Sequence, residues 1–118
     1  MSKTKIIEIG SLVSDFKEEK LLVLFDETAP PELRDISIIH QFDEKTQDAF
    51  QPGKTLQIGN KEYTIEKVGS EANSNFEELG HVSIYFKEDG NEEILPGAVI
   101  VTPSVFPELH VGDFIVIK

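Results

Sequence analysis

The 118-residue chain lacks cysteine and tryptophan altogether, and it has no long apolar run. The absence of cysteine excludes disulfide cross-links, thiolate catalysis and cysteine-ligated zinc or iron–sulfur sites. No apolar stretch approaches the roughly eighteen residues that a membrane-spanning helix needs, and the N-terminal segment is no exception. We therefore expect a cytoplasmic protein without direct membrane insertion.

Positive charge is also scarce, with 11 Lys and Arg against 22 Asp and Glu and a formal net charge of −11. Nucleic-acid binding depends largely on basic residues that neutralise phosphates, so this composition argues against a nucleic-acid partner. An acidic surface serves ordinary solubility, and it also steers the encounter with a basic protein partner. Charge alone leaves both interpretations open.

Common catalytic motifs are missing as well. The sequence has no glycine-rich phosphate-binding loop and no nucleophile elbow. Its three histidines have no local metal-ligand spacing, and we expect neither a metal site nor a cofactor. The adjacent carboxylates Glu77–Glu78 and Glu92–Glu93 point in different directions on any regular element. We interpret them as solvated acids rather than as the catalytic pair of a glycosidase.

What the chain does contain is a series of short strand-like segments separated by turn residues. Such segments predict an all-β protein, a small closed or partly open β-barrel with one or two short helices, and a sandwich is the alternative. The length suits a single domain over residues 1–118. The expected strands are Lys3–Ile9, Leu21–Phe25, Asp35–Phe42, Thr55–Ile58, Lys61–Ile65, Gly80–Phe86, Ala98–Val101 and Phe114–Ile117.

The clearest local signal is a β-hairpin. Gly59–Asn60 is a two-residue link with glycine first, which suits a type II′ turn and places Leu56 opposite Tyr63. Val68 has the wrong parity to share the face of Tyr63, because side chains alternate along a strand. This mismatch predicts a bulge near residues 66 and 67.

Helix is expected only in short pieces. Ser11–Glu19 has apolar residues at near-helical spacing, and the Pro30–Pro31 pair suits the opening of one helical turn. Ser74–Glu77 fits a capping box, and Gly80 is the natural left-handed stop of that helix. Residues 89–91 predict a turn.

His40 is the candidate catalytic residue. Alternation places it on the strand face that also carries Ile36, Ile38 and Phe42. Two interpretations follow: a core histidine held by neighbouring backbone, or a nucleophile that a dry pocket keeps neutral. We expect His40 to reach a surface cavity lined by aliphatic residues.

The other two histidines differ in context. His81 follows Gly80 at the start of a strand, so we expect it to be half exposed and placed for polar contacts. His110 lies in a turn before the last strand and is interpreted as a surface residue. Two histidines on separate strands, without cysteine or a metal motif, point only weakly to imidazole chemistry.

Six short motifs are spread along the chain: Ile38–His40, Phe50–Gly53, Gly59, Val68–Ser70, Glu78–Val82 and Leu95–Gly97. Together they resemble the glucitol/sorbitol-specific enzyme IIA of the bacterial sugar phosphotransferase system, and the similarity extends nearly from end to end. The resemblance implies a β-barrel with little helix in which His40 is phosphorylated by the histidine phosphocarrier HPr. It also implies transfer onward to the sugar-specific enzyme IIB, part of the IIB/IIC membrane components.

The resemblance leaves some roles open. Family members carry a second histidine soon after the active one, whereas this chain has Phe42, so that neighbour is not essential to a mechanism here. His81 is the candidate for a second catalytic imidazole that donates to the phosphoryl oxygens, or it merely fills the strand start. A non-catalytic acidic β-barrel that serves as a binding or regulatory module remains the alternative function.

Overall fold

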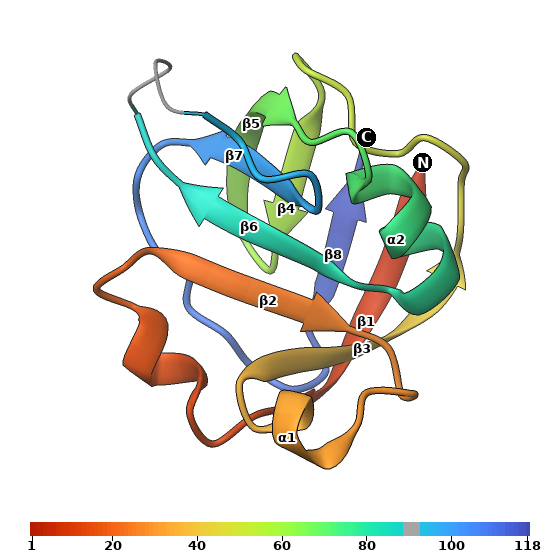
Figure 1. Cartoon of the computed structure of the whole chain (residues 1–118), viewed down its shortest axis with the longest axis vertical. Coiled ribbons are helices and arrows are strands. Elements are labelled where there is room, and N and C mark those ends of the chain that lie inside the picture. Colours follow the sequence, from red (N-terminus) through yellow and green to blue (C-terminus); the bar gives the residue numbers. More distant parts are fainter. Residues whose placement is uncertain (89–92) are drawn as a thin grey trace.

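Eight strands close into a barrel in the computed structural model, which describes residues 1–88 and 93–118 (Figure 1). The expected all-β barrel is thus confirmed, and the sandwich alternative is wrong. Around the barrel the strands follow the order β1-β3-β2-β6-β7-β5-β4-β8. Their bounds are β1 (Ser2–Ile9), β2 (Leu21–Phe25), β3 (Ser37–Glu44), β4 (Thr55–Ile58), β5 (Lys61–Val68), β6 (Val82–Phe86), β7 (Ala98–Thr102) and β8 (Phe114–Ile117).

Strand pairing is mostly antiparallel, but β2 runs parallel to β3 and β6 runs parallel to β7. Parallel neighbours require a crossover connection, and α1 (Pro31–Arg34) lies in the crossover from β2 to β3. The helix starts at Pro31, as the sequence predicts, because proline has no amide hydrogen to leave unpaired there. The other predicted helical turn is η1 (Val13–Phe16).

The β4–β5 hairpin has the predicted register, with Leu56 opposite Tyr63. The predicted bulge is confirmed too, since the register of β5 against β7 shifts between Ile65 and Lys67. The turn predicted at residues 89–91 lies outside the described residues.

Helix α2 (Ala72–Leu79) begins earlier than the capping box predicts. Ser74 lies inside the helix and its hydroxyl donates to the Glu71 carbonyl (3.1 Å), so the predicted cap is wrong. Tertiary contacts fix the helix start instead: the Glu71 amide donates to the Pro96 carbonyl (2.8 Å). The predicted end is confirmed, because Gly80 has the left-handed conformation with φ of 60°.

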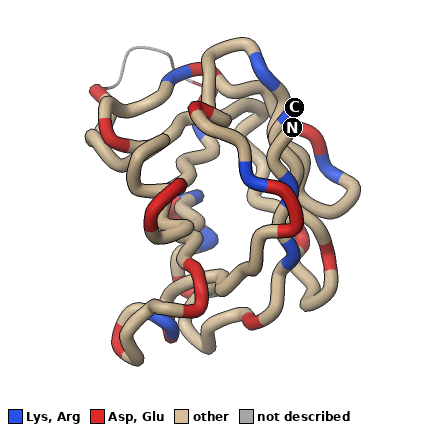
Figure 2. The backbone as a smooth tube through the Cα atoms, turned by 90° about the vertical axis from the view of Figure 1, so that its right-hand side faces the viewer, with Lys and Arg blue, Asp and Glu red and all other residues tan. Residues whose placement is uncertain are grey.

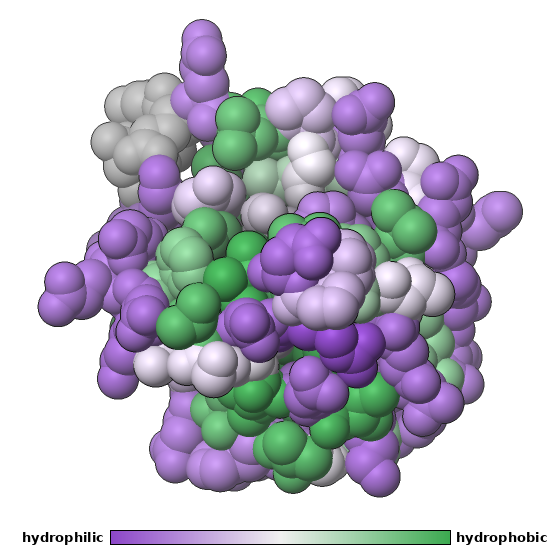
Figure 3. All heavy atoms as spheres, turned by 60° about the horizontal axis from the view of Figure 1, so that its bottom comes forward, coloured by the Kyte–Doolittle hydropathy of each residue, from purple (hydrophilic) through white to green (hydrophobic). Residues whose placement is uncertain are grey.

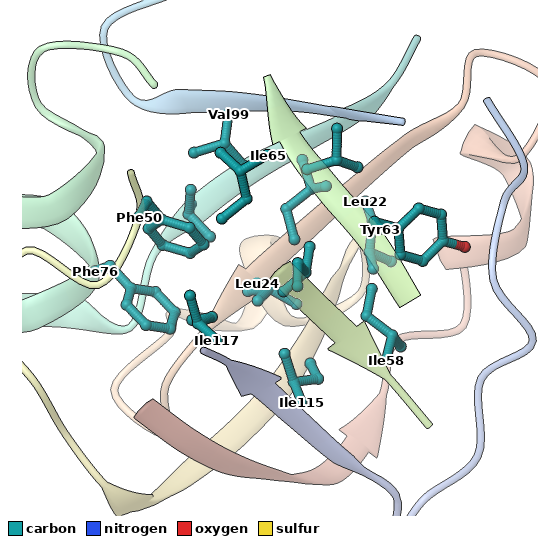
Figure 4. Packing of buried hydrophobic residues seen from close by; sticks show 14 of the residues in the cluster. Leu22, Leu24, Phe50, Ile58, Tyr63, Ile65, Phe76, Val99, Ile115 and Ile117 are labelled. Carbon is teal, nitrogen blue, oxygen red and sulfur yellow. The ribbon is translucent and has the colours of Figure 1, made fainter. Parts of the chain in front are cut away.

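The barrel interior is filled by side chains from the inward faces of all the strands, with Phe50 and Phe76 closing one part of it (Figure 4). On β1 the inward residues include Thr4 and Ile6, and on β3 they include Ile38 and His40. The fold therefore buries the Thr4 hydroxyl and the His40 imidazole among mostly apolar residues, and Ser2 and Ser37 are the other buried polar residues in the described part of the chain.

A second, smaller apolar cluster of Phe25, Ala29 and Ile39 is separate from the barrel core. Ile39 alternates with His40 along β3, so this cluster covers the outer face of the barrel wall. On the face brought forward in Figure 3, apolar areas (green) are separated by polar side chains (purple). In the described part of the chain no helix is long and apolar enough to cross a bilayer.

Candidate functional site

His40 lies on β3 opposite Ile6 of β1 and is 0% exposed. The expectation that it reaches a surface cavity is therefore wrong. Helix α2 covers the imidazole: the ring of Phe76 stacks on it with centroids 5.6 Å apart, and Phe42 meets it edge-on at 5.2 Å. The apolar strand face was predictable by alternation, but the cover comes from a segment about forty residues away in sequence.

Both ring nitrogens of His40 are hydrogen-bonded. Nε2 lies 2.7 Å from the Gly80 carbonyl oxygen, and Nδ1 lies 2.6 Å from the Thr4 hydroxyl oxygen. A carbonyl only accepts hydrogen bonds, so Nε2 carries the proton of the neutral ring. Nδ1 consequently keeps its lone pair and accepts from the Thr4 hydroxyl.

Burial lowers the pKa of His40 below its usual value, because desolvation disfavours the imidazolium. The Gly80 carbonyl and the Asp26 carboxylate oppose this effect, and the positive charge of Lys45 adds to it. Lys45 is held over the site, with its ammonium 4.9 Å from the Phe42 ring centroid and bonded to the Glu77 carbonyl. His40 is thus neutral at neutral pH, and its one ring lone pair, on Nδ1, accepts from the Thr4 hydroxyl.

Gly80, which has no side chain, is the part of the cover that contacts His40 Nε2. A Cβ atom at this position would lie 2.9 Å from His40 Nε2 and 2.9 Å from the Asp26 Cβ, so no side chain fits without movement. The Asp26 amide donates to the Leu79 carbonyl (3.0 Å), which fastens the end of α2 to the segment after β2. Beyond the glycine backbone, the half-buried Asp26 is the next group.

His81 is half-buried, as predicted, but it faces away from His40. Its Nδ1 donates to the Leu24 carbonyl (3.2 Å), and its ring lies 4.6 Å from that of Phe25 in the outer cluster. In the described residues no hydrogen bond or ring contact joins the two imidazoles. They are linked through Gly80, which bonds His40 and precedes His81 in the chain.

His110 is a surface residue, as predicted, with a side chain 60% exposed and 3.2 Å from the Glu108 carboxylate. It lines a cavity of about 310 Å³ together with Phe106 and Asp113, and none of the residues lining this cavity contacts His40. Across residues 1–88 and 93–118, no group of three or more metal-ligating side chains is found.

The adjacent carboxylates also have separate environments. The Glu77 carboxylate accepts from the Asp48 amide (3.0 Å), whereas Glu78 is exposed. The interpretation as solvated acids holds for the exposed Glu78, whereas Glu77 is half-buried and hydrogen-bonded. Glu92, from the other adjacent pair, lies outside the described residues.

Thr4 is the member of the site that sequence reasoning missed. It shares the parity of Ile6 on β1, so alternation places its hydroxyl on the inward face. A polar side chain on an apolar strand face requires a partner, and His40 is the matching polar residue on another predicted strand. Only the pairing of β1 with β3, which is a long-range contact, shows that the two meet.

Comparison with known proteins shows which proteins the chain is similar to. The family model of the PTS system glucitol/sorbitol-specific IIA component matches residues 1–116. The glucitol/sorbitol-specific EIIA components of Shigella flexneri and Escherichia coli K12 are each 36% identical to the chain over 112 residues, which is 94% of this chain and 89% of theirs. The crystal structure of a PTS system IIA component from Enterococcus faecalis V583 has 34% identity and a TM-score of 0.85 over 96% of both chains.

Proposed function

Because the chain belongs to the family of glucitol/sorbitol-specific IIA components of the phosphotransferase system, we propose that it carries a phosphoryl group on His40 during sugar uptake. HPr donates the group, and a glucitol/sorbitol-specific enzyme IIB of the membrane-bound IIB/IIC components accepts it. The protein acts in the cytoplasm as one IIA domain over residues 1–118. The observation that carries this proposal is a buried, neutral imidazole with one lone pair at His40.

A neutral imidazole is chemically suited to the task. A ring nitrogen with a lone pair attacks the phosphorus in line, and the bond from phosphorus to the donor imidazole breaks as the new one forms. The aromatic rings of Phe42 and Phe76 exclude water that would otherwise hydrolyse the phosphohistidine. Transfer requires the cover at Gly80 to open when the carrier docks, since His40 is sealed in the free protein.

The surface charge suits a basic carrier. Acidic residues are spread over many segments of the backbone (Figure 2). Several lie close to His40 in the fold or in sequence: Asp26 borders Gly80, Glu78 is exposed at the end of α2, and Asp43 and Glu44 follow on β3. Such an acidic rim steers a partner with basic residues around its own phosphohistidine and disfavours nucleic acid.

His81 is the proposed second imidazole of the site. Its Nδ1–H is committed to the Leu24 carbonyl, so its Nε2 donates to a phosphoryl oxygen only when the ring carries a second proton. Its place one residue after Gly80 brings it to the edge of the cover that must open. In this role it would neutralise charge that develops on the transferred group.

A non-catalytic binding or regulatory module is the second candidate. The observation in its favour is that His40 is fully buried with both nitrogens bonded, which is also how a purely structural histidine is held. Such a module would bind a carrier or regulator without receiving phosphate.

Labelling separates the two functions. The protein is incubated with phosphoenolpyruvate, the enzyme that activates HPr, and HPr, and the label is then mapped to a peptide. We expect label on His40 that is lost in mild acid and stable in base, because protonation makes the phosphorylated imidazole a good leaving group. His40→Gln should remove the label, whereas the exposed His110→Gln serves as the matched control and should keep it. Label that persists in His40→Gln, or that resists acid, would reject the proposal.

A further inference from the structure

The hydrogen bonds of His40 hold its ring in one tautomer. The Gly80 carbonyl, 2.7 Å from Nε2, requires a proton on that nitrogen, and the Thr4 hydroxyl, 2.6 Å from Nδ1, donates to the lone pair on the other. The nucleophilic lone pair of the resting protein is therefore on Nδ1.

That lone pair faces the inside of the barrel. Thr4 is 1% exposed and lies on β1, which is hydrogen-bonded to β3 on one side and to β8 on the other. A carrier protein would have to part the barrel wall to bring phosphorus to Nδ1. Nε2, in contrast, faces Gly80, where backbone without a side chain forms the cover.

We propose that Thr4 positions His40 for a tautomer switch, in which Nδ1–H donates to the Thr4 oxygen while Nε2, freed from the Gly80 carbonyl, attacks the phosphoryl group. This inference rests on the proposed function and identifies the atoms that perform it. A threonine hydroxyl both donates and accepts, so Thr4 holds the ring in place before and after the switch. Gly80 holds the ring in the unreactive state, because its carbonyl accepts a hydrogen bond only from the Nε2–H tautomer.

The step balances in protons and electrons. When the Gly80 carbonyl moves away, the released ring tilts into the opening, where water takes the proton from Nε2 and supplies one to Nδ1. The ring then returns to Thr4 as the neutral Nδ1–H tautomer. The Nε2 lone pair then forms the bond to phosphorus. The bond between phosphorus and the imidazole of the phosphorylated carrier breaks at the same time, and its electron pair returns to the carrier nitrogen.

Nitrogen-15 NMR of the imidazoles tests the two states directly. In the resting protein we expect the Nε2–H tautomer at His40. After transfer from phosphorylated HPr we expect phosphorus coupled to Nε2 and a proton on Nδ1. Phosphate on Nδ1 would overturn the inference. This measurement uses the wild-type protein, so it identifies the phosphorylated nitrogen even if a Thr4 variant fails to fold.

Two substitutions test the role of Thr4. Thr4→Val keeps the shape of the side chain and removes the hydroxyl, and we expect the transfer rate at saturating carrier to fall roughly tenfold, the value of one ordinary hydrogen bond. The half-saturating carrier concentration should not change, because Thr4 is buried and cannot touch the carrier. Thr4→Ser, which retains the hydroxyl, should restore the rate.

The outcomes distinguish this inference from the function on which it rests. A folded Thr4→Val protein that transfers at the wild-type rate overturns the role of Thr4 while the phosphocarrier function stands. Equal losses in Thr4→Val and Thr4→Ser also overturn it, since they would indicate packing rather than the hydroxyl. A wild-type protein that accepts no phosphate rejects the proposed function and the inference with it.

Discussion

Phe42 and Phe76 enclose the His40 ring from two directions and also contact each other, with centroids 5.0 Å apart. Phe42 supplies apolar surface beside His40 and no proton donor. The environment of His40 is accordingly drier than a second imidazole at this position would make it. A dry environment keeps the ring neutral, and it also makes protonation of the ring costly for the fold.

That cost predicts a pH dependence of stability. The folded pKa of His40 is lowered by burial, with Asp26 and Lys45 as the charged groups that act on it. Below about pH 6.5 the unfolded chain therefore binds a proton that the native protein does not, and stability falls until the lowered folded pKa is passed. Between about pH 7.5 and about pH 5.5 the wild type should lose about 1 kcal/mol more free energy of unfolding than His40→Gln.

Urea titrations at the two pH values measure this difference. His110→Gln is the control for removal of an exposed imidazole, because the His110 side chain is 60% exposed. Identical slopes for wild type and His40→Gln would show that protonation of His40 is not linked to folding.

His81 carries a separate prediction. His81→Ala should slow phosphoryl passage on the order of a hundredfold, the usual effect of removing one donor to a developing oxyanion, while the fold stays intact. The half-buried ring touches Phe25 and Leu24 only at the outer wall, so circular dichroism and the unfolding midpoint should change little. Rapid-quench transfer assays in both directions, with His110→Ala as control, measure the rate. Unchanged rates would mean that His81 only packs at the start of its strand and takes no part in the transfer.

At the level of secondary-structure elements, the end of α2 has two roles: it caps the helix, and it covers the imidazole of His40. Gly80 has φ of 60°, and its amide donates to the Phe76 carbonyl (2.9 Å). The same residue presents its carbonyl to His40. The conformation that stops the helix therefore also sets the tautomer of the imidazole.

Gly80→Ala should destabilise the protein by about 2 kcal/mol. The left-handed conformation costs a non-glycine residue about 1–2 kcal/mol, and the added Cβ would press on His40 Nε2 and Asp26. Gly53→Ala is a matched control, because Gly53 also has positive φ (92°) but its added Cβ would meet nothing within 4 Å. Chemical unfolding should show a larger loss at Gly80 than at Gly53. Equal losses would mean that His40 and Asp26 move aside easily.

Local sequence patterns predicted most of the strands and helices, and they failed where contacts between distant segments determine the structure. The β4–β5 hairpin, the bulge after Ile65 and the helical turn at Pro31 all follow from turn chemistry and alternation, and the structure has them. The start of α2 depends on a bond to Pro96, which no local pattern contains. The sealing of His40 depends likewise on the β1–β3 pairing and on Gly80. The site was therefore half predictable: its histidine from sequence, its partners only from the fold.

At the scale of the whole molecule, the net charge of −11 predicts that the rate of association with a basic partner depends on salt. Transfer from HPr at low carrier concentration should slow about tenfold between about 0.05 M and about 0.5 M salt, because screening removes electrostatic steering. Glu78→Gln, at the end of α2, should reduce the low-salt rate more than Glu19→Gln, which lies at the far end of β2. Stopped-flow kinetics measure both, and a rate independent of salt would exclude steering by the acidic surface.

The last strand of the barrel also governs how the chain is made. β8 pairs with β1 on one side and with β4 on the other, so residues 114–117 close the ring. Until residues 114–117 have been synthesised, β1 and β4 each have one edge whose backbone amides and carbonyls lack a partner strand. A message truncated just before β8 would therefore yield a chain prone to join other chains through those edges rather than a smaller working domain.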